Sequence, residues 1–271
     1  MSLTVRCLGS GSSGNALLID TGSTAIVVDC GLHSRALDSG LRAADRDLAT
    51  IDALLLTHEH VDHVRALPRF VTARVPVIAS PGTATAASIS PSTLELLPLR
   101  GTTQIGDVTV TSLAVSHDAA EPCGYHLQAG EGALTIITDL GCGSPELAPF
   151  IAVSDLVIVE ANHDEAMVRS GPYPTHLKRR ILSSTGHLSN EDCGRLLTQS
   201  LVGANRLPTV WLAHLSAANN RPVLARQTVQ RALAGQGLVP PVIPLPRQGH
   251  DRLWRLDQQS ASVVQLAMVL T

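Results

Sequence analysis

The chain has 271 residues, a formal net charge of −3 and a pI of about 6.4, and aromatic residues make up only 2% of it. The sequence therefore has neither a basic field over the whole protein nor a supply of rings for stacking unpaired bases, although bound divalent cations would supply positive charge locally. The length is typical of one α/β domain, and we expect residues 1–271 to form a single domain.

Targeting signals and cysteine usage indicate the cellular compartment of the protein. No run of about 18 apolar residues occurs, and the N-terminus lacks a charged segment followed by an apolar one. Five cysteines are scattered without a CxxC pair. We expect a cytoplasmic protein with reduced thiols and no membrane partner. Nothing in the sequence indicates an oligomeric state.

The first part of the chain predicts strands at residues 3–8, 16–20 and 24–29 and a helix at 33–42. The turn-rich loop SGSSGN, residues 10–15, joins the first two strands. This loop lacks the Lys-Ser/Thr ending of a phosphate-binding loop and leads into a strand, which argues against a nucleotide site. Asp29, at the end of the third strand, is either the carboxylate partner of a metal-binding histidine or an ordinary turn residue.

The next predicted strand, residues 52–57, runs directly into His58-Glu59-His60-Val61-Asp62-His63. Strand ends are places where a rigid scaffold presents reactive side chains on loops. Imidazole and carboxylate groups together suit zinc, and they tolerate manganese or iron. A solvated turn would not need three of the chain's 11 histidines so close together. We therefore predict a metal site at this motif.

Three further candidate ligands, His117, Asp139 and His214, each follow a predicted apolar strand. We predict strands at 76–79, 108–115, 124–128, 133–138, 156–160 and 209–213, helices at 61–72 (perturbed by Pro68), 173–184, 190–201 and 221–233, and strand-like runs at 252–256 and 262–269. Taken alone, His117 could be a surface residue and Asp139 a turn former. Groups at the ends of different strands converge on one edge of a sheet, so we expect one cleft holding two ions ~3.5–4 Å apart.

Two of the predicted helices carry the candidate substrate-binding residues. Lys178-Arg179-Arg180 is the one compact basic run in the chain, although such runs are usually solvated helix faces. Ser189 or Asn190 can cap the helix at 190–201, whose first backbone N–H groups can also hold a phosphate. We assign substrate binding to Ser189, Asn190, Lys178, Arg179 and Asn219.

The pattern H-x-H-x-D-H after a strand resembles the signature of the metallo-β-lactamase fold. The strings SGSSGNA, SHDAAEP, TDLG, EANHD, KRRIL, GHLSNED and HLSAANN are similar to those of a narrower branch, the YycJ/WalJ-like hydrolases. Together these strings are specific, whereas each one alone is weak. The resemblance implies an α/β fold of the metallo-β-lactamase type, an αββα sandwich of two mixed β-sheets flanked by helices.

The resemblance also implies a role for each residue of the cleft. The implied metal ligands are His58, His60 and His117 for one ion, Asp62, His63 and His214 for a second, and Asp139 as the bridging carboxylate. Asp62 and Asp139 would thus be catalytic as well as ligating. His187 is similar to a histidine that nucleases of this fold use near the leaving group, with Glu160 as its carboxylate partner, while the alternative for His187 is a helix-capping loop residue. His163 is assigned to the same cleft.

The implied activity is that of a dinuclear metal-dependent hydrolase using a hydroxide that bridges two divalent ions, zinc first and manganese or iron as alternatives. The resemblance implies a phosphodiesterase, a 5′→3′ exonuclease with DNA as its nucleic-acid partner. A thioester or lactone hydrolase similar to glyoxalase II would use the same metal core, but it would not require GHLSNED or KRRIL. A metal-free binding module is a third interpretation, although degenerate members usually break the H-x-H-x-D-H string, and antibiotic hydrolysis is disfavoured.

Overall fold

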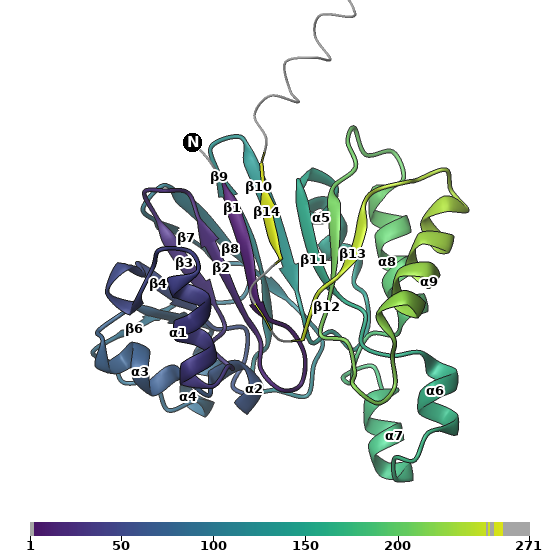
Figure 1. Ribbon diagram of the computed structural model, residues 1–271, viewed down its shortest axis with the longest axis horizontal. Coiled ribbons are helices and arrows are strands. Elements are labelled where there is room, and N and C mark those ends of the chain that lie inside the picture. The colour runs from purple at the N-terminus through teal and green to yellow at the C-terminus, as the bar shows by residue number, and fades with distance from the viewer. Residues whose placement is uncertain (1–2, 248, 250–251, 257–271) are drawn as a thin grey trace, which may run out of the picture.

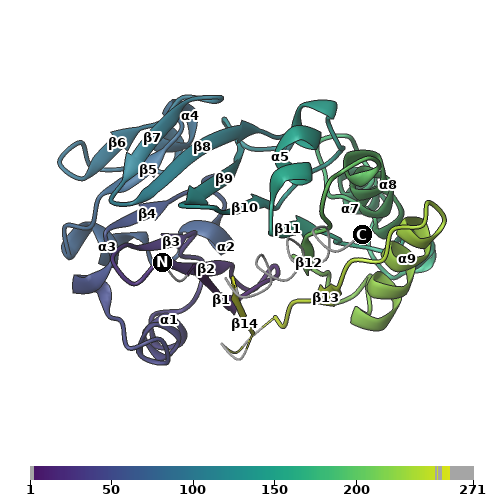
Figure 2. The ribbon, with the colours of Figure 1, turned by 90° about the horizontal axis from the view of Figure 1, so that it is seen from above.

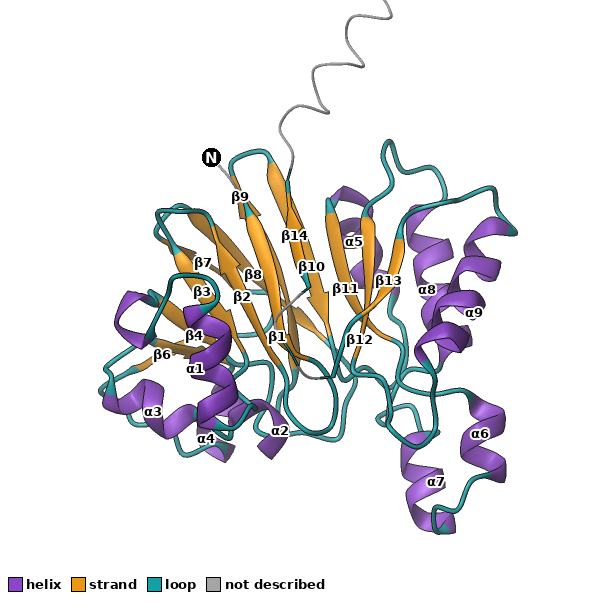
Figure 3. Ribbon diagram, viewed as in Figure 1, coloured by secondary structure: helices purple, strands orange, loops and turns teal. Residues whose placement is uncertain are grey.

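The computed structural model describes residues 3–247, 249 and 252–256, so the strand expected at 262–269 lies outside the described residues. Two seven-stranded sheets pack face to face (Figures 1 and 3). The first sheet contains, in spatial order, β14 (Leu253–Arg255), β1 (Thr4–Gly9), β2 (Ala16–Asp20), β3 (Ala25–Val28), β4 (Ala53–Leu55), β5 (Val77–Ala79) and β6 (Leu94–Leu96). The second contains β13 (Val242–Pro244), β12 (Thr209–Ala213), β11 (Leu156–Glu160), β10 (Gly132–Ile137), β9 (Cys123–Ala129), β8 (Val108–Ala114) and β7 (Thr102–Ile105).

Both sheets are mixed, as the resemblance to the metallo-β-lactamase fold implies. Strands β14, β1, β2 and β3 pair antiparallel, and β3 to β6 pair parallel. In the second sheet β7 to β10 pair antiparallel, and β10 to β13 pair parallel. This arrangement brings the carboxyl ends of β8, β10, β11 and β12 to one edge of the second sheet, where loops from several strands can meet.

Alternation along the strands divides the core into three apolar layers. In β3, Ile26 and Val28 face the second sheet, while Ala25 and Val27 face the helices on the other side. β11 behaves in the same way, because its side chains also divide between the layer that separates the sheets and an outer helical layer. Because both faces of these strands are buried, their sequences are continuous apolar runs.

Helices cover the outer face of each sheet (Figure 2). Those against the first sheet are α1 (Ser34–Arg42), α3 (Leu67–Thr72) and α4 (Pro81–Ala86), and those against the second are α5 (Ala148–Val153), α8 (Asn190–Leu201) and α9 (Pro222–Ala234). The short α2 (Val61–Val64) and the 3-10 turns η1 (Leu48–Thr50) and η2 (Pro145–Leu147) complete this part of the fold. Within the described residues, no helix has the length and apolar character needed to cross a bilayer.

The single helix expected at 61–72 is wrong, because the structure divides it into α2 and α3. Pro68 has no N–H to donate to the carbonyl of Val64, and its ring disfavours a continuous helix there. The expected helix at 173–184 is shorter, as α7 (Thr175–Ile181). Strands β6, β7 and β13 and helices α5 and α6 were not predicted, because each is short and carries little periodic signal.

Helix α6 (Glu165–Ser170) and helix α7 form an arm, residues 165–181, that extends beyond the sandwich (Figure 1). The arm follows β11 and projects from the edge where α2 also lies (Figure 3). Val168 is the buried residue of α6 and Ile181 that of α7. The arm is therefore attached through few apolar contacts, and its other side chains remain available at the surface.

Candidate metal centre

Strand ends from both sheets place the candidate ligands together. The motif His58–His63 follows β4, His117 follows β8, Asp139 follows β10 and His214 follows β12. Their nitrogen and oxygen atoms form overlapping groups in which all atoms lie within 4.8 Å of one another: His58, His60 and His117; His58, His63 and Asp139; Asp62, His63 and His214; and Asp139, Glu160, His187 and His214. The convergence expected from the sequence is thus present in the structure.

Three residues within two positions of a strand end have a left-handed backbone. The φ angles of Asp29, Asp139 and His214 are 60°, 53° and 53°. Side chains other than glycine adopt this conformation at a cost, although Asp and His tolerate it better than most residues. Such strained positions concentrate at functional sites, where the surrounding structure enforces them. Here they turn the chain sharply out of the sheet at three points around the cluster.

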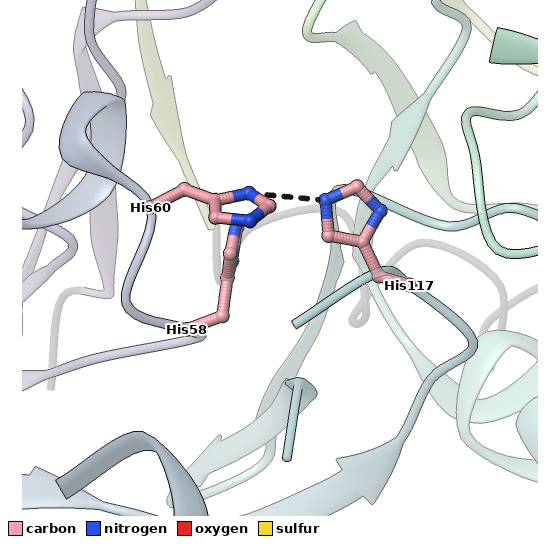
Figure 4. Close-up of side chains that lie close together, drawn as sticks. All are labelled: His58, His60 and His117. Carbon is pink, nitrogen blue, oxygen red and sulfur yellow. Dashed lines mark hydrogen bonds between the residues drawn. The ribbon is translucent and has the colours of Figure 1, made fainter. Parts of the chain in front are cut away.

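His58, His60 and His117 form the first histidine group (Figure 4). His117 donates from Nδ1 to the carbonyl oxygen of Gly186 at 2.9 Å, and its Nε2 lies 3.3 Å from Nδ1 of His60. Burial lowers the pKa of His117, and it holds that of His58 well below the ordinary value. Both rings are therefore neutral, with lone pairs available for a metal ion.

Asp62, His63, Asp139 and His214 form the second group. Nε2 of His63 lies 3.0 Å from Oδ2 of Asp139, and Nε2 of His214 lies 3.5 Å from Oδ2 of Asp62. Burial alone would lower the pKa of His63, but the carboxylates of Asp29 and Asp139 outweigh it and raise that pKa to about 10. Burial alone would raise the pKa of Asp139, but His214 and His63 hold it well below its usual range. Positive and negative charge thus stabilise one another at this half of the site.

Two buried carboxylates hold these histidines from behind. Asp29 Oδ2 lies 2.8 Å from Nδ1 of His63, and Asp29 Oδ1 accepts from the backbone N–H of Thr57 at 2.9 Å. Glu160 Oε1 lies 2.8 Å from Nδ1 of His214 and 2.9 Å from Nδ1 of His187. In His63 and His214 this leaves Nε2 on the side of Asp139 and Asp62, which is the arrangement that orients metal-binding imidazoles. Of the two interpretations of Asp29, these contacts favour the histidine partner.

The donor set fits divalent metal ions. Among the described residues, Nε2 of His58 and Nε2 of His214 are buried nitrogen atoms without a hydrogen-bond partner. Buried polar atoms are rarely left unsatisfied, and an unsatisfied one points to a missing ion or water. Imidazole nitrogens and carboxylate oxygens are the ligands that zinc and related ions prefer.

A cavity of about 260 Å³ opens over the cluster. Its lining residues are His60, Asp62, Asp139, Asn162, His187, His214, Ser12, Ser216 and, from the arm and its end, Tyr173, Leu177, Arg180 and Ile181. His187 lines this cavity with its side chain 20% exposed, and its Nδ1 lies 3.5 Å from Oδ1 of Asp139. Burial lowers the pKa of His187, but Glu160 outweighs it and the net shift is upward.

The residues assigned to substrate binding lie outside the lining of this cavity. Lys178 donates from Nζ to the backbone oxygen of Arg169 at 2.7 Å, and Arg179 points into solvent. Ser189 caps α8 by accepting from the N–H of Asp192 at 3.0 Å. Asn190, Asn219 and His163 are buried near the same helix end. The sequence-based assignment missed Tyr173 and Arg180, of which Arg180 belongs to the same basic run.

Comparison with known proteins agrees with this geometry. A family described as "Beta-lactamase superfamily domain" matches residues 24–207. The chain is 36% identical over 245 residues to a Bacillus anthracis protein named Exodeoxyribonuclease YycJ, covering 88% of this chain and 91% of that protein. It is 35% identical over 237 residues to Exodeoxyribonuclease WalJ of Streptococcus pneumoniae, covering 84% and 87%.

A solved structure shares the fold. The metallo-β-lactamase fold protein YhfI from Bacillus subtilis matches with a TM-score of 0.72, covering 94% of this chain and 100% of that one. The identity of 17% limits this similarity to the fold. The expected sandwich of two mixed sheets between helices is confirmed.

Proposed function

Because the chain belongs to the metallo-β-lactamase superfamily and is similar over most of its length to proteins named exodeoxyribonuclease, we propose that it is a metal-dependent nuclease acting on DNA. The observation that carries the proposal is the cluster of imidazole and carboxylate groups under one cavity, in which Nε2 of His58 and Nε2 of His214 are buried without a hydrogen-bond partner. We further propose cleavage in the 5′→3′ direction and two divalent ions, zinc first and manganese or iron as alternatives.

The histidine groups suggest how two ions would be held. His58, His60 and His117 would hold one, Asp62, His63 and His214 the other, and Asp139 would face both. When bound, the ions supply activation of a water molecule near neutral pH and neutralise negative charge on the phosphate. Asp29 and Glu160 keep Nε2 of His63 and His214 directed at the site, so the ligands need no rearrangement.

His187 is the proposed proton donor. It lines the cavity, and Glu160 holds its Nδ1 at 2.9 Å, which leaves Nε2 for the substrate. The carboxylates of Glu160 and Asp139 favour the protonated imidazole. When the bond between phosphorus and the 3′ oxygen breaks, this imidazolium gives its proton to the departing oxygen.

The test is a digestion assay with end-labelled single- and double-stranded DNA and RNA, with and without added zinc or manganese. We expect metal-dependent release of nucleotides from the 5′ end of DNA, and no release by a His58→Ala variant. S-lactoylglutathione is assayed in parallel, because a thioesterase would use the same ligands. Hydrolysis of the thioester without cleavage of DNA would overturn the proposal, and so would a metal content near zero in protein purified without chelator.

A further inference from the structure

We propose that Tyr173 and Arg180 position the 5′-terminal nucleotide of the substrate: the ring of Tyr173 stacks on its base, and the guanidinium of Arg180 binds its phosphate. This inference rests on the proposed nuclease function and assigns the substrate contacts of the same cavity. The two residues lie on the segment 171–181 that forms one wall of the cavity, opposite the strand-end ligands.

The wall is formed by one face of α7. Leu177, Arg180 and Ile181 are spaced three and four residues apart on α7, and Tyr173 lies just before the helix, next to Pro174 at its N-cap. Residues at this spacing share one helix face, so the arm turns a continuous surface toward the cluster. Ile181 is buried and anchors this face, whereas Arg180 is exposed. The surface thus combines the apolar side chains of Leu177 and Ile181 with the cation of Arg180 and the ring of Tyr173.

Among the described residues that line the cavity, Arg180 is the one Lys or Arg. Its Nε donates to Oδ2 of Asp118 at 2.5 Å, which fixes the direction of the guanidinium beside His117. Within the described part of the chain, Nη1 and Nη2 make no hydrogen bond, and the side chain is 55% exposed. A guanidinium held at Nε with its two outer nitrogens free presents the fork that binds phosphate oxygens.

Tyr173 is the one Phe, Tyr or Trp among the described residues that line the cavity. The chain has only two each of Tyr, Trp and Phe, and Tyr125, Phe70 and Trp211 are fully buried in the core. Tyr173 is half-exposed and stands between Pro172 and Pro174, which restrict the backbone on both sides. A ring presented on a stiff backbone loses little freedom when a base stacks on it, and such stacking tolerates every base.

The size of the cavity favours a single nucleotide. At about 260 Å³ it lies near the lower end of the ~300–1,000 Å³ of small-molecule pockets, which suits one nucleotide better than several. One nucleotide can therefore enter between the arm and the ligand cluster while the rest of the strand stays outside. This arrangement matches an enzyme that removes nucleotides from a strand end.

The experiment pairs each protein variant with a change in the substrate. Tyr173→Ala and Arg180→Ala are assayed on DNA with a normal 5′ end, with an abasic 5′-terminal residue, and with a 5′-hydroxyl in place of the 5′-phosphate. Tyr173→Phe keeps the ring, and Arg169→Ala removes an arm cation that is paired with Glu165 away from the cavity. Bis(p-nitrophenyl) phosphate, which has neither base nor terminal phosphate, reports the metal centre alone.

We expect Tyr173→Ala to lower kcat/KM about 10-fold on normal DNA, mostly through KM, and to have no further effect on the abasic substrate. Arg180→Ala should lower kcat/KM about 10-fold or more on 5′-phosphorylated DNA and have no further effect on the 5′-hydroxyl substrate. Tyr173→Phe and Arg169→Ala should stay within about 2-fold of the parent protein. Arg169→Ala should hydrolyse the small diester at the parent rate, and Tyr173→Ala and Arg180→Ala should lose much less activity on it than on normal DNA.

The proposal is overturned if either alanine variant matches the parent protein on normal DNA, or if it loses activity equally on all substrates, since the residue would then only support the fold. Degradation from the 3′ end would overturn the assignment of the terminal phosphate to Arg180. Fluorescence anisotropy measures binding of a phosphorothioate oligonucleotide by the metal-loaded protein. This measurement distinguishes failure of the Tyr173 and Arg180 assignment from failure of the proposed nuclease function. A parent protein that binds DNA as tightly as both variants refutes the positioning pair, whereas a parent protein that neither binds nor cleaves DNA refutes the nuclease itself.

Discussion

The strand-end cluster and the α6–α7 arm lie on opposite sides of one cavity and are built in different ways. The ligands of the cluster are largely buried, and carboxylates behind them fix their orientation, as Glu160 does for His187 and His214. The arm consists of two short helices with one buried residue each. A rigid half suits chemistry, which requires ligands at fixed positions, and a lightly attached half suits contact with a substrate.

This difference predicts two kinds of response to mutation. Removing one ligand from the cluster leaves its buried partners uncompensated, so the effect should be nearly complete. Removing one side chain from the arm costs one contact with the substrate, so the effect should be graded.

The largest effect is expected for Asp139→Asn. Asparagine keeps the volume and tolerates the left-handed backbone at φ 53°, so the substitution removes the charge without straining the turn. Without the carboxylate between His63 and His214, we expect metal content to fall and nuclease activity to drop about 1000-fold or more. Elemental analysis and the digestion assay measure the two quantities.

Asp45→Asn is the matched control, because Asp45 also has a left-handed backbone, with φ 54°, but lies after α1 and away from the cluster. It should leave metal content and activity unchanged. If Asp139→Asn retained both metal and activity, the cluster would not be the metal centre.

A smaller loss is expected for His187→Ala. General acid catalysis contributes about 100- to 10,000-fold, so kcat should fall within that range. Metal content should stay at the parent level, because Glu160 still holds His214 when His187 is absent. Loss of metal together with activity would instead make His187 a structural residue of the cluster.

The sequence predicted the cluster well because its features are local. The motif His58–His63 is contiguous, and His117, Asp139 and His214 each stand just after an apolar run whose burial can be read from the sequence. Mixed sheets then bring strand ends to one edge, so the convergence follows from topology.

The arm was predicted poorly for a physical reason. Which residues of KRR face the cavity depends on the rotation of α7 about its axis, and one position along a helix changes the direction by about 100°. The sequence therefore indicated Lys178 and Arg179, whereas Arg180 is the residue that lines the cavity. Helix 61–72 breaks into α2 and α3 near Pro68, the residue expected from the sequence to perturb it.

A packing substitution tests whether the rigidity of the cluster matters. A Cβ added to Gly31 would lie 1.6 Å from the backbone oxygen of Asp62, so Gly31→Ala must displace the motif that carries four candidate ligands, His58, His60, Asp62 and His63. A shift of about 1 Å at a catalytic group can cost about 100-fold in rate. We therefore expect a loss of that order, together with a lower Tm.

Gly235→Ala provides the comparison for this packing test, because a Cβ there meets its nearest atom at 3.4 Å, an ordinary contact. It should leave activity unchanged. Equal behaviour of the two glycine variants in melting and activity assays would show that the motif tolerates displacement.

The smallest effect is expected for Lys178→Ala. The bond from Lys178 Nζ to the oxygen of Arg169 ties α7 to α6 at the surface, where such a contact contributes up to about 1 kcal/mol. Its loss should loosen the arm, raise KM about 2-fold and leave kcat unchanged. Arg179 is exposed and has no hydrogen bond among the described residues, so Arg179→Ala should change KM by less. If either variant lowered kcat/KM as strongly as Arg180→Ala, the arm would act through its total charge, and the contrast between one directed guanidinium and its solvated neighbours would be lost.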